Sequence, residues 1–222
     1  MPFRALLFDI DGTLVDSNDQ HIAAWDAVFR DEGIVIARAA IHDQIGKGAD
    51  MLIPALVPDA DAEQRDRLAK AHGALFKARY LEAVRPFPGA YDLLAAAHAA
   101  GQAVVLASSA SGAELDHYLD LLDARALVAA TTSADDVAST KPAPDIFATA
   151  LDRVAPIGAD AAVAIGDTPY DMEAAGRCGI RGIGLRSGGF TDAALRGGGA
   201  AWLYDDVAAL LADRRGALGH GG

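Results

Sequence analysis

The sequence contains one cysteine, no long apolar run and no leader-like start, and each shortage excludes a class of protein. Cys178 stands alone among 222 residues, so the chain cannot form an internal disulfide. No apolar stretch approaches the roughly 20 residues that a membrane span needs, and no signal-peptide pattern precedes the first predicted strand. We therefore expect a cytoplasmic protein without a membrane partner.

Positive charge is also scarce. Lysine and arginine number 19 against 31 acidic residues, which gives a formal net charge of −12. Nucleic acids and anionic membranes bind basic surfaces, so this balance argues against either as a partner. It does not argue against a phosphorylated substrate, because a metal ion and one or two local cations reverse the field inside a cleft.

What the chain does contain is an alternation of strand and helix patterns. Buried strands are predicted at 5–8, 103–107, 127–130, 161–165 and 182–185. Helices are predicted at 90–100, 114–122, 145–154, 172–178 and 207–213. Such alternation implies a parallel sheet that is covered on both faces, with catalytic loops at the carboxyl ends of its strands.

The stretch from 16 to 85 departs from this alternation because it is mostly helical and shows no convincing strand pattern. His21 and Trp25 share one face of a helix that Gly33 would end, and a second long helix is predicted over 62–84. A tryptophan at helical spacing is more often part of a core than of a site.

Prolines and a glycine at 85–89 mark the return to alternation. The predicted fold class is therefore α/β: a Rossmann-like parallel-sheet core interrupted after its first strand by an all-α cap. We place the core at 1–16 plus 85–222 and the cap at 17–84.

The segment that directly follows the first strand carries the strongest chemical signal. Asp9 and Asp11 leave the strand on the same side, because residues two apart point the same way, and Gly12 allows the chain to turn. Carboxylates this close repel each other unless a cation lies between them, and hard oxygen ligands suit Mg²⁺. The alternative is a turn with solvated acids, since Asp-Gly is a common turn signal.

Three later segments also place polar groups beside predicted strands or helices. They are Ser108-Ser109, Lys141-Pro142-Ala143-Pro144-Asp145, and Gly166-Asp167-Thr168-Pro169-Tyr170-Asp171. Each has a structural alternative. The serines could form a helix N-cap, Lys141 could be a solvated surface residue, and Asp171 could cap a helix. The role of the glycine-containing segment at 186–189 stays open.

In this order the four segments resemble motifs I to IV of the haloacid dehalogenase (HAD) superfamily. The helical cap between motifs I and II resembles that of β-phosphoglucomutase-like and phosphoglycolate phosphatase-like members. The resemblance implies that Asp9 is the nucleophile and that Asp11 is the general acid and then the base. Asp11 would need a raised pKa in the substrate-bound state, which burial under the cap favours.

The resemblance also implies how phosphate and metal are held. The implied phosphate ligands are Ser108, the backbone N–H of Ser109, and Lys141. The implied Mg²⁺ ligands are Asp9, the backbone carbonyl of Asp11, and Asp167, with Asp171 bonding metal-bound water or backbone N–H groups.

The cap offers two further candidates. His21 is either a hydrogen-bonded cap histidine or a residue that assists the hinge or the general acid. Lys47, in Gly46-Lys47-Gly48, lies either in a solvated turn or in a specificity loop that meets an anionic group. Sugar phosphomutases need cap cations for a second phosphate, and Ala49 replaces the arginine expected just beyond this loop, which weakens a mutase assignment.

The expected function is a Mg²⁺-dependent phosphatase that hydrolyses a small phosphomonoester through an aspartyl-phosphate intermediate. The alternatives are a sugar phosphomutase, a phosphonate-cleaving enzyme that uses a cap lysine, and a non-catalytic binding protein. The expected partner is a small phosphorylated metabolite. The oligomeric state is left open, with a monomer favoured.

Overall fold

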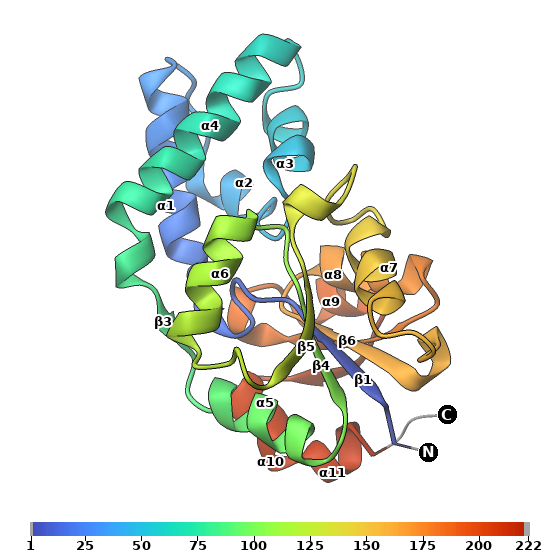
Figure 1. Ribbon diagram of the computed structural model, residues 1–222. Coiled ribbons are helices and arrows are strands. Elements are labelled where there is room, and N and C mark those ends of the chain that lie inside the picture. The colour runs from blue at the N-terminus through green and yellow to red at the C-terminus, as the bar shows by residue number, and fades with distance from the viewer. Residues whose placement is uncertain (1, 220–222) are drawn as a thin grey trace.

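The computed structural model describes residues 2–219, and a single parallel sheet lies at their centre (Figure 1). Its six strands follow the order β5-β4-β1-β6-β7-β8, and every neighbouring pair is parallel. The strands are β1 Ala5–Phe8, β4 Ala103–Ala107, β5 Val128–Thr132, β6 Ala162–Gly166, β7 Arg181–Leu185 and β8 Ala200–Tyr204. This arrangement confirms the predicted α/β fold class.

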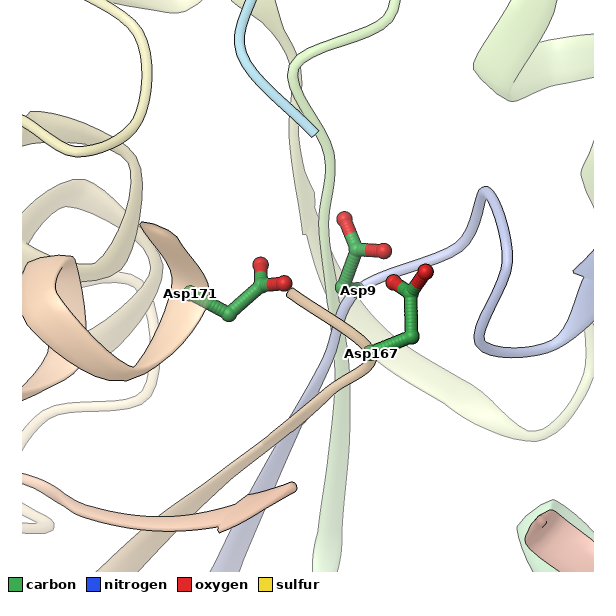
Figure 2. A group of neighbouring side chains, drawn as sticks. All are labelled: Asp9, Asp167 and Asp171. Carbon is green, nitrogen blue, oxygen red and sulfur yellow. The ribbon is translucent and has the colours of Figure 1, made fainter. Parts of the chain in front are cut away.

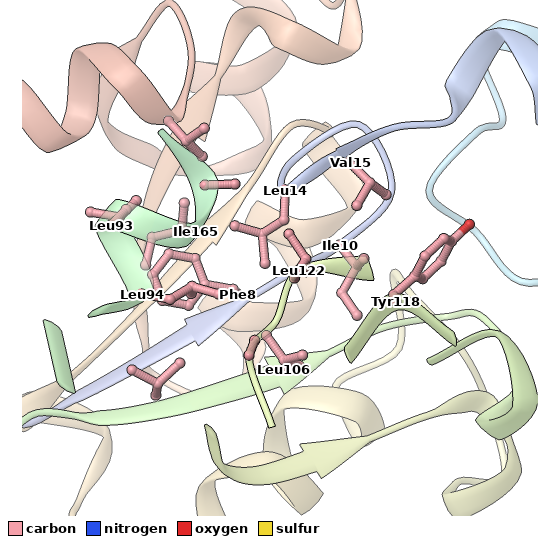
Figure 3. Close-up of a cluster of buried hydrophobic side chains, with 14 of the residues drawn as sticks. Phe8, Ile10, Leu14, Val15, Leu93, Leu94, Leu106, Tyr118, Leu122 and Ile165 are labelled. Carbon is pink, nitrogen blue, oxygen red and sulfur yellow. The ribbon is translucent and has the colours of Figure 1, made fainter. Parts of the chain in front are cut away.

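Helices cover both faces of the sheet. One face packs against α5 Ala90–Ala99, α6 Gly112–Leu121 and α10 Val207–Ala212, and the other against α7 Asp145–Asp152 and α8 Pro169–Arg177. Along β1, Leu6 and Phe8 join the first cluster (Figure 3), whereas Ala5 and Leu7 join the second. This alternation follows from the two-residue repeat of a strand that is buried on both sides.

A separate helical layer lies beyond the carboxyl ends of the strands (Figure 1). It consists of α1 Asn18–Asp31, α2 Arg38–His42, α3 Ala49–Leu56 and α4 Ala62–Arg79. The layer has its own apolar cluster, in which Trp25 is 3% exposed. The inserted all-α cap is thereby confirmed, and Trp25 belongs to its core. The predicted helix at 62–84 ends at Arg79, and a short 3-10 helix follows at Leu81–Ala83.

A two-stranded antiparallel ribbon marks the two places where the chain crosses between core and cap. It pairs β2 Val15–Asp16 with β3 Arg85–Pro86, with Val15 opposite Pro86 and Asp16 opposite Arg85. The two crossings therefore lie side by side, at the residues where the sequence placed the limits of the cap. The division into domains at these limits stays a prediction.

The sheet extends one strand beyond the sequence prediction, which had ended it near 182–185. Helix α9 Asp192–Gly198 and strand β8 precede the last helices, α10 and α11 Arg214–Ala217. Three glycines at 197–199 indicated a loop there, and α9 is too short for its periodicity to be recognised. None of the helices within residues 2–219 has both the length and the apolar content that crossing a membrane requires.

The order of the strands decides where a ligand can bind. The chain runs from β1 to β4 and β5 on one side, and then returns to β6, β7 and β8 on the other. Strand β1 therefore lies at the point where the direction of winding reverses. Open α/β sheets bind ligands in the crevice at this point, beyond the carboxyl ends of the strands.

Candidate active site

Three buried carboxylates meet at the carboxyl ends of β1 and β6 (Figure 2). Asp9 follows β1, Asp167 follows β6, and Asp171 lies in the first turn of α8. One carboxylate oxygen of each lies within 4.8 Å of the others. Asp9 is 4% exposed, and the other two residues are fully buried. The parallel sheet thus brings together acids that are about 160 residues apart in sequence.

One ammonium group accompanies these acids. Lys141 is fully buried in the loop before α7, where its Nζ donates to Asp9 Oδ1 and lies 2.8 Å from Asp171 Oδ1. Three carboxylates and one ammonium give a charge of −2 when all four groups are ionised. Because a buried net charge is strongly unfavourable, this balance calls for a divalent cation or for protons.

The pKa values of the acids reflect this excess of buried negative charge. Burial raises the pKa of Asp9 to about 7, although the charge of Lys141 acts in the opposite direction. Burial also raises the pKa of Asp167 well above its usual range, and the charges of Asp9 and Asp171 add to this rise. Carboxylate oxygens are preferred ligands of Mg²⁺, so the donor set fits that ion in both charge and chemistry.

The side chain of Asp167 is held from several directions. Thr13 Oγ1 donates to its Oδ1 at 3.0 Å, and Asn18 Nδ2 donates to its Oδ2 at 2.9 Å. Two glycines leave room for it, since a Cβ on Gly12 or Gly188 would lie 2.1 or 2.0 Å from Asp167 Oδ2. Thr13 and Asn18 both lie close to the first motif, but only the fold shows that their partner is Asp167.

Asp171, Ser108 and Ser109 differ in their hydrogen-bond partners. Asp171 Oδ2 accepts from Thr168 N at 3.1 Å and from Thr168 Oγ1 at 2.7 Å, which closes a capping box at the start of α8. Ser108 is buried after β4, and its Oγ accepts from the backbone N–H of Ala110. Ser109 faces the cavity described below, and its buried Oγ has no hydrogen-bond partner within residues 2–219.

The side chain of Asp11 is hydrogen-bonded to three residues outside the cluster of Asp9, Asp167 and Asp171. Its Oδ1 accepts from Ser17 Oγ at 2.6 Å, Tyr118 OH at 2.9 Å and His21 Nε2 at 3.2 Å. Burial acts to raise the pKa of Asp11, but the charge of His21 and the three hydrogen bonds outweigh it, so the pKa lies below its usual range. These donors stabilise the carboxylate in this structure, and the raised pKa expected for the substrate-bound state stays a prediction.

An aromatic stack surrounds the histidine that contacts Asp11. The ring of His21 lies 3.8 Å from that of Phe76, and its Nδ1 lies 3.5 Å from Nε2 of His72. The ring of His72 in turn lies 4.0 Å from that of Trp25. Burial opposes protonation of His21, but the neighbouring Asp11 raises its pKa overall. Burial and the charge of His21 lower the pKa of His72 well below its usual value.

A cavity of about 620 Å³ lies between the cap and the core. Its wall includes Asp9, Asp11, His21, Lys47, His72 and Ser109. Lys47 Nζ donates to Gln44 at 2.6 Å and lies 4.3 Å from the centre of the Tyr170 ring. The structure therefore brings both cap candidates, His21 and Lys47, to the same cavity as the nucleophile candidate.

Sequence reasoning did not identify His72 or Tyr118 as parts of the site. Both lie on helices, α4 and α6, at positions that the periodic pattern assigns to packing. Tyr118 reaches Asp11 across 107 residues of sequence. No local signal predicts such a contact, because it depends on how α6 packs against the loop that follows β1.

A family model described as haloacid dehalogenase-like hydrolase matches residues 6–185. The chain belongs to this hydrolase family. The match confirms the resemblance drawn from the four motifs, and it identifies the protein as an enzyme. It spans β1 through β7 and includes the entire cap.

Individual known proteins also resemble this chain over most of its length. Phosphoglycolate phosphatase from Rhodospirillum rubrum is 27% identical over 220 residues, which cover 93% of this chain and 89% of the relative. A hydrolase structure from Pseudomonas syringae matches with a TM-score of 0.90 at 32% identity, covering 96% of this chain and 98% of that one. CbbY from Rhodobacter sphaeroides, in complex with phosphate, has a TM-score of 0.78 at 26% identity and covers 94% and 96%.

Proposed function

We propose that the protein is a Mg²⁺-dependent phosphatase that hydrolyses a small phosphomonoester through an aspartyl-phosphate on Asp9. The observation that carries this proposal is the cluster of Asp9, Asp167 and Asp171 around buried Lys141, in which Asp9 also lines the cavity between cap and core. The phosphoglycolate phosphatase relatives support the reaction class. The phosphate complex of CbbY supports phosphate as the group that is bound.

Phosphoryl transfer depends mainly on positioning and on neutralising charge. Asp9 attacks phosphorus, and Lys141 opposes the repulsion between the carboxylate and the phosphoryl oxygens. Bound Mg²⁺ would supply the remaining positive charge, held by Asp9, Asp167 and the backbone carbonyl of Asp11. Ser108 and the backbone N–H of Ser109 hold the phosphoryl oxygens. The unpartnered Ser109 Oγ offers the substrate one further donor.

Proton transfer falls to Asp11 and His21. Their 3.2 Å contact holds one proton between a carboxylate of lowered pKa and an imidazole of raised pKa. We propose that Asp11 delivers this proton to the leaving oxygen and later takes one from the attacking water. The cap lies over the cavity and would exclude other water during the first step.

The test is phosphate release from a panel of phosphomonoesters that includes 2-phosphoglycolate and p-nitrophenyl phosphate. We expect release with Mg²⁺, none with EDTA, and a loss of about three orders of magnitude or more in Asp9→Asn. Asp59→Asn, an exposed cap acid, is the matched control and should retain full activity.

Two results would contradict the proposal. Release that is undiminished in Asp9→Asn would exclude the aspartyl-phosphate route. If the substrate disappears without free phosphate and a positional isomer accumulates, the enzyme is a phosphomutase instead. Product analysis by phosphorus NMR separates the two reactions.

A further inference from the structure

The segment of the cap that links α2 to α3 rests on the core. We call residues 42–50 the docking segment. Its contacts include ones to Thr140, Thr168, Tyr170 and Gly188 of the core, and each of these four residues adjoins or packs on one of the acids or the lysine described above. The most extensive contact joins Asp50 and Gly48 to Thr140.

Asp50 and Thr140 form a pair of hydrogen bonds across the boundary between cap and core. Thr140 Oγ1 donates to Asp50 Oδ1 at 2.5 Å, and the Thr140 backbone N–H donates to Asp50 Oδ2 at 3.0 Å. The Thr140 hydroxyl also accepts from the backbone N–H of Gly48 at 2.9 Å. A Cβ on Gly48 would lie 2.5 Å from the Thr140 methyl group, so the close approach requires glycine there.

Thr140 directly precedes Lys141 in the chain. It is 5% exposed, and its backbone and hydroxyl are both bound by the docking segment. Lys141 then enters the core, where its Nζ lies between Asp9 and Asp171. Bonds that restrain the backbone at Thr140 therefore restrain the point from which the Lys141 side chain starts.

Three further contacts of the docking segment follow the same pattern. Tyr170 OH donates to the backbone carbonyl of Asp43, and Tyr170 directly precedes Asp171. His42 Nε2 donates to the carbonyl of Gly188 at 2.9 Å, and Gly188 packs on Asp167. A Cβ on Gly46 would lie 2.6 Å from Thr168, which directly follows Asp167.

We propose that Asp50 is a positioning residue that acts through Thr140. Lys141 takes its place between Asp9 and Asp171 only while the docking segment is bound to the core. Closure of the cap over a substrate is thereby coupled to completion of the charged cluster. This inference rests on the proposed phosphatase reaction, because Lys141 acts there on the phosphoryl group.

The coupling predicts a particular kinetic signature. Removing the Asp50 carboxylate loosens Lys141 in the closed complex, and we expect kcat to fall about tenfold, as for a lost charge-assisted hydrogen bond. KM should change by less than about twofold, because Asp50 lies outside the cavity wall. Asp50→Asn retains one acceptor for Thr140, so its kcat should lie between those of the wild type and Asp50→Ala.

The experiment compares kcat and KM for the wild type, Asp50→Ala, Asp50→Asn and the control Asp59→Ala, all as the full chain. The substrate is the one that the wild type hydrolyses best in the phosphomonoester panel. Asp59 is an exposed carboxylate in the turn between α3 and α4, and its removal should leave both constants unchanged. Circular dichroism and thermal unfolding of each variant separate loss of fold from loss of positioning.

A second variant keeps the inference testable if Asp50→Ala does not fold. Thr140→Val removes the hydroxyl and retains the shape, so it should lower kcat in the same way but less, because the backbone bond to Asp50 remains. In the double variant the losses should not add, because both substitutions break one linkage. Additive losses would contradict the coupling.

The outcomes separate this inference from the proposed function. An active wild type with an equal kcat in Asp50→Ala would overturn the positioning role and leave the phosphatase assignment intact. A raised KM at unchanged kcat would assign Asp50 to substrate binding and would also overturn it. A wild type that releases no phosphate from any substrate would remove both proposals.

Discussion

Individual side chains in this site differ in protonation because their immediate neighbours differ. Asp9 is buried among other acids, and its pKa rises to about 7. Asp11 lies two residues further on, but it accepts three hydrogen bonds and its pKa falls. The proposed nucleophile and the proposed acid–base group are thus distinguished by their surroundings, although they come from one short motif.

His72 provides a test of how burial and neighbouring charges set protonation in this site, because its pKa is lowered by burial and by the charge of His21. In the unfolded chain it binds a proton near its ordinary pKa of 6.5, whereas in the folded protein it resists protonation. Stability is therefore retained above pH 6.5 and lost as the pH falls below it. Below pH 6.5, His72→Phe should reduce the slope of the unfolding free energy against pH by up to about 1.4 kcal/mol per pH unit, which is the value for one proton.

Urea unfolding at a series of pH values measures this effect. An unaltered slope in His72→Phe would show that His72 titrates alike in the folded and unfolded chains.

At the scale of elements, the loop after β7, whose role the sequence left open, contacts the site. Ser187 Oγ donates to the carbonyl of Gly12 at 2.6 Å, and the neighbouring Arg186 pairs with Asp192 and Asp205. Gly188 then lies against the side chain of Asp167. The loop thereby supports the turn of the first motif and the proposed metal ligand at once.

Replacing Gly188 by alanine should disturb the metal site. The added Cβ would lie 2.0 Å from Asp167 Oδ2 and 2.8 Å from the Asp167 carbonyl, so the carboxylate must move. We expect the Mg²⁺ concentration for half-maximal activity to rise by about 10- to 100-fold, as for other groups that orient a metal ligand.

The control for this variant lies nearby in α9. Beyond its chain neighbours and its own helix backbone, a Cβ on Gly197 meets no atom of residues 2–219 within 4 Å, so Gly197→Ala should keep the Mg²⁺ requirement. It should also raise the unfolding free energy by about 0.5–1 kcal/mol, because alanine is favoured over glycine in a helix. Equal Mg²⁺ requirements in the two variants would show that the Gly188 contact does not orient Asp167.

For the whole molecule, the buried acids connect metal binding to stability. Without a metal, Asp9 binds its proton more tightly in the folded protein than in the unfolded chain, where its pKa is 3.8. Its contribution to stability is therefore complete below pH 3.8 and is lost as the pH rises through about 7. A divalent cation would reverse this loss, because it stabilises the ionised carboxylates.

Mg²⁺ should therefore raise the unfolding temperature, and more at about pH 8 than at about pH 6, where protons compete for Asp9. At a concentration near 100 times the dissociation constant we expect a gain of about 2.7 kcal/mol, or roughly 5–10 °C. Differential scanning calorimetry with Mg²⁺ and with EDTA measures the shift.

Two variants from the activity test also test this shift in unfolding temperature. Asp59→Asn should retain the Mg²⁺ shift, whereas Asp9→Asn should reduce it and weaken its dependence on pH. Identical unfolding temperatures with Mg²⁺ and with EDTA at both pH values would count against a metal in the acidic cluster.

Much of this protein could be predicted from its sequence, because the determining signals are local. An apolar run that ends in Asp9 and Asp11 marks a buried strand and the chemistry at its end, and the alternation after 85–89 implies a parallel sheet. The order of the four motifs was enough to indicate the family. The last strand, β8, was missed because three glycines and a seven-residue helix leave no periodic pattern.

Tertiary structure alone decided which groups meet. The lowered pKa of Asp11 depends on Tyr118 and His21, and the proposed role of Asp50 depends on its contact with Thr140, 90 residues away. His21 was a candidate from the sequence, but no local pattern marks Tyr118 or Thr140 as a partner. A motif specifies the residues at the end of a strand, whereas hydrogen bonds, burial and charge between distant segments arise only when the sheet and the cap pack together.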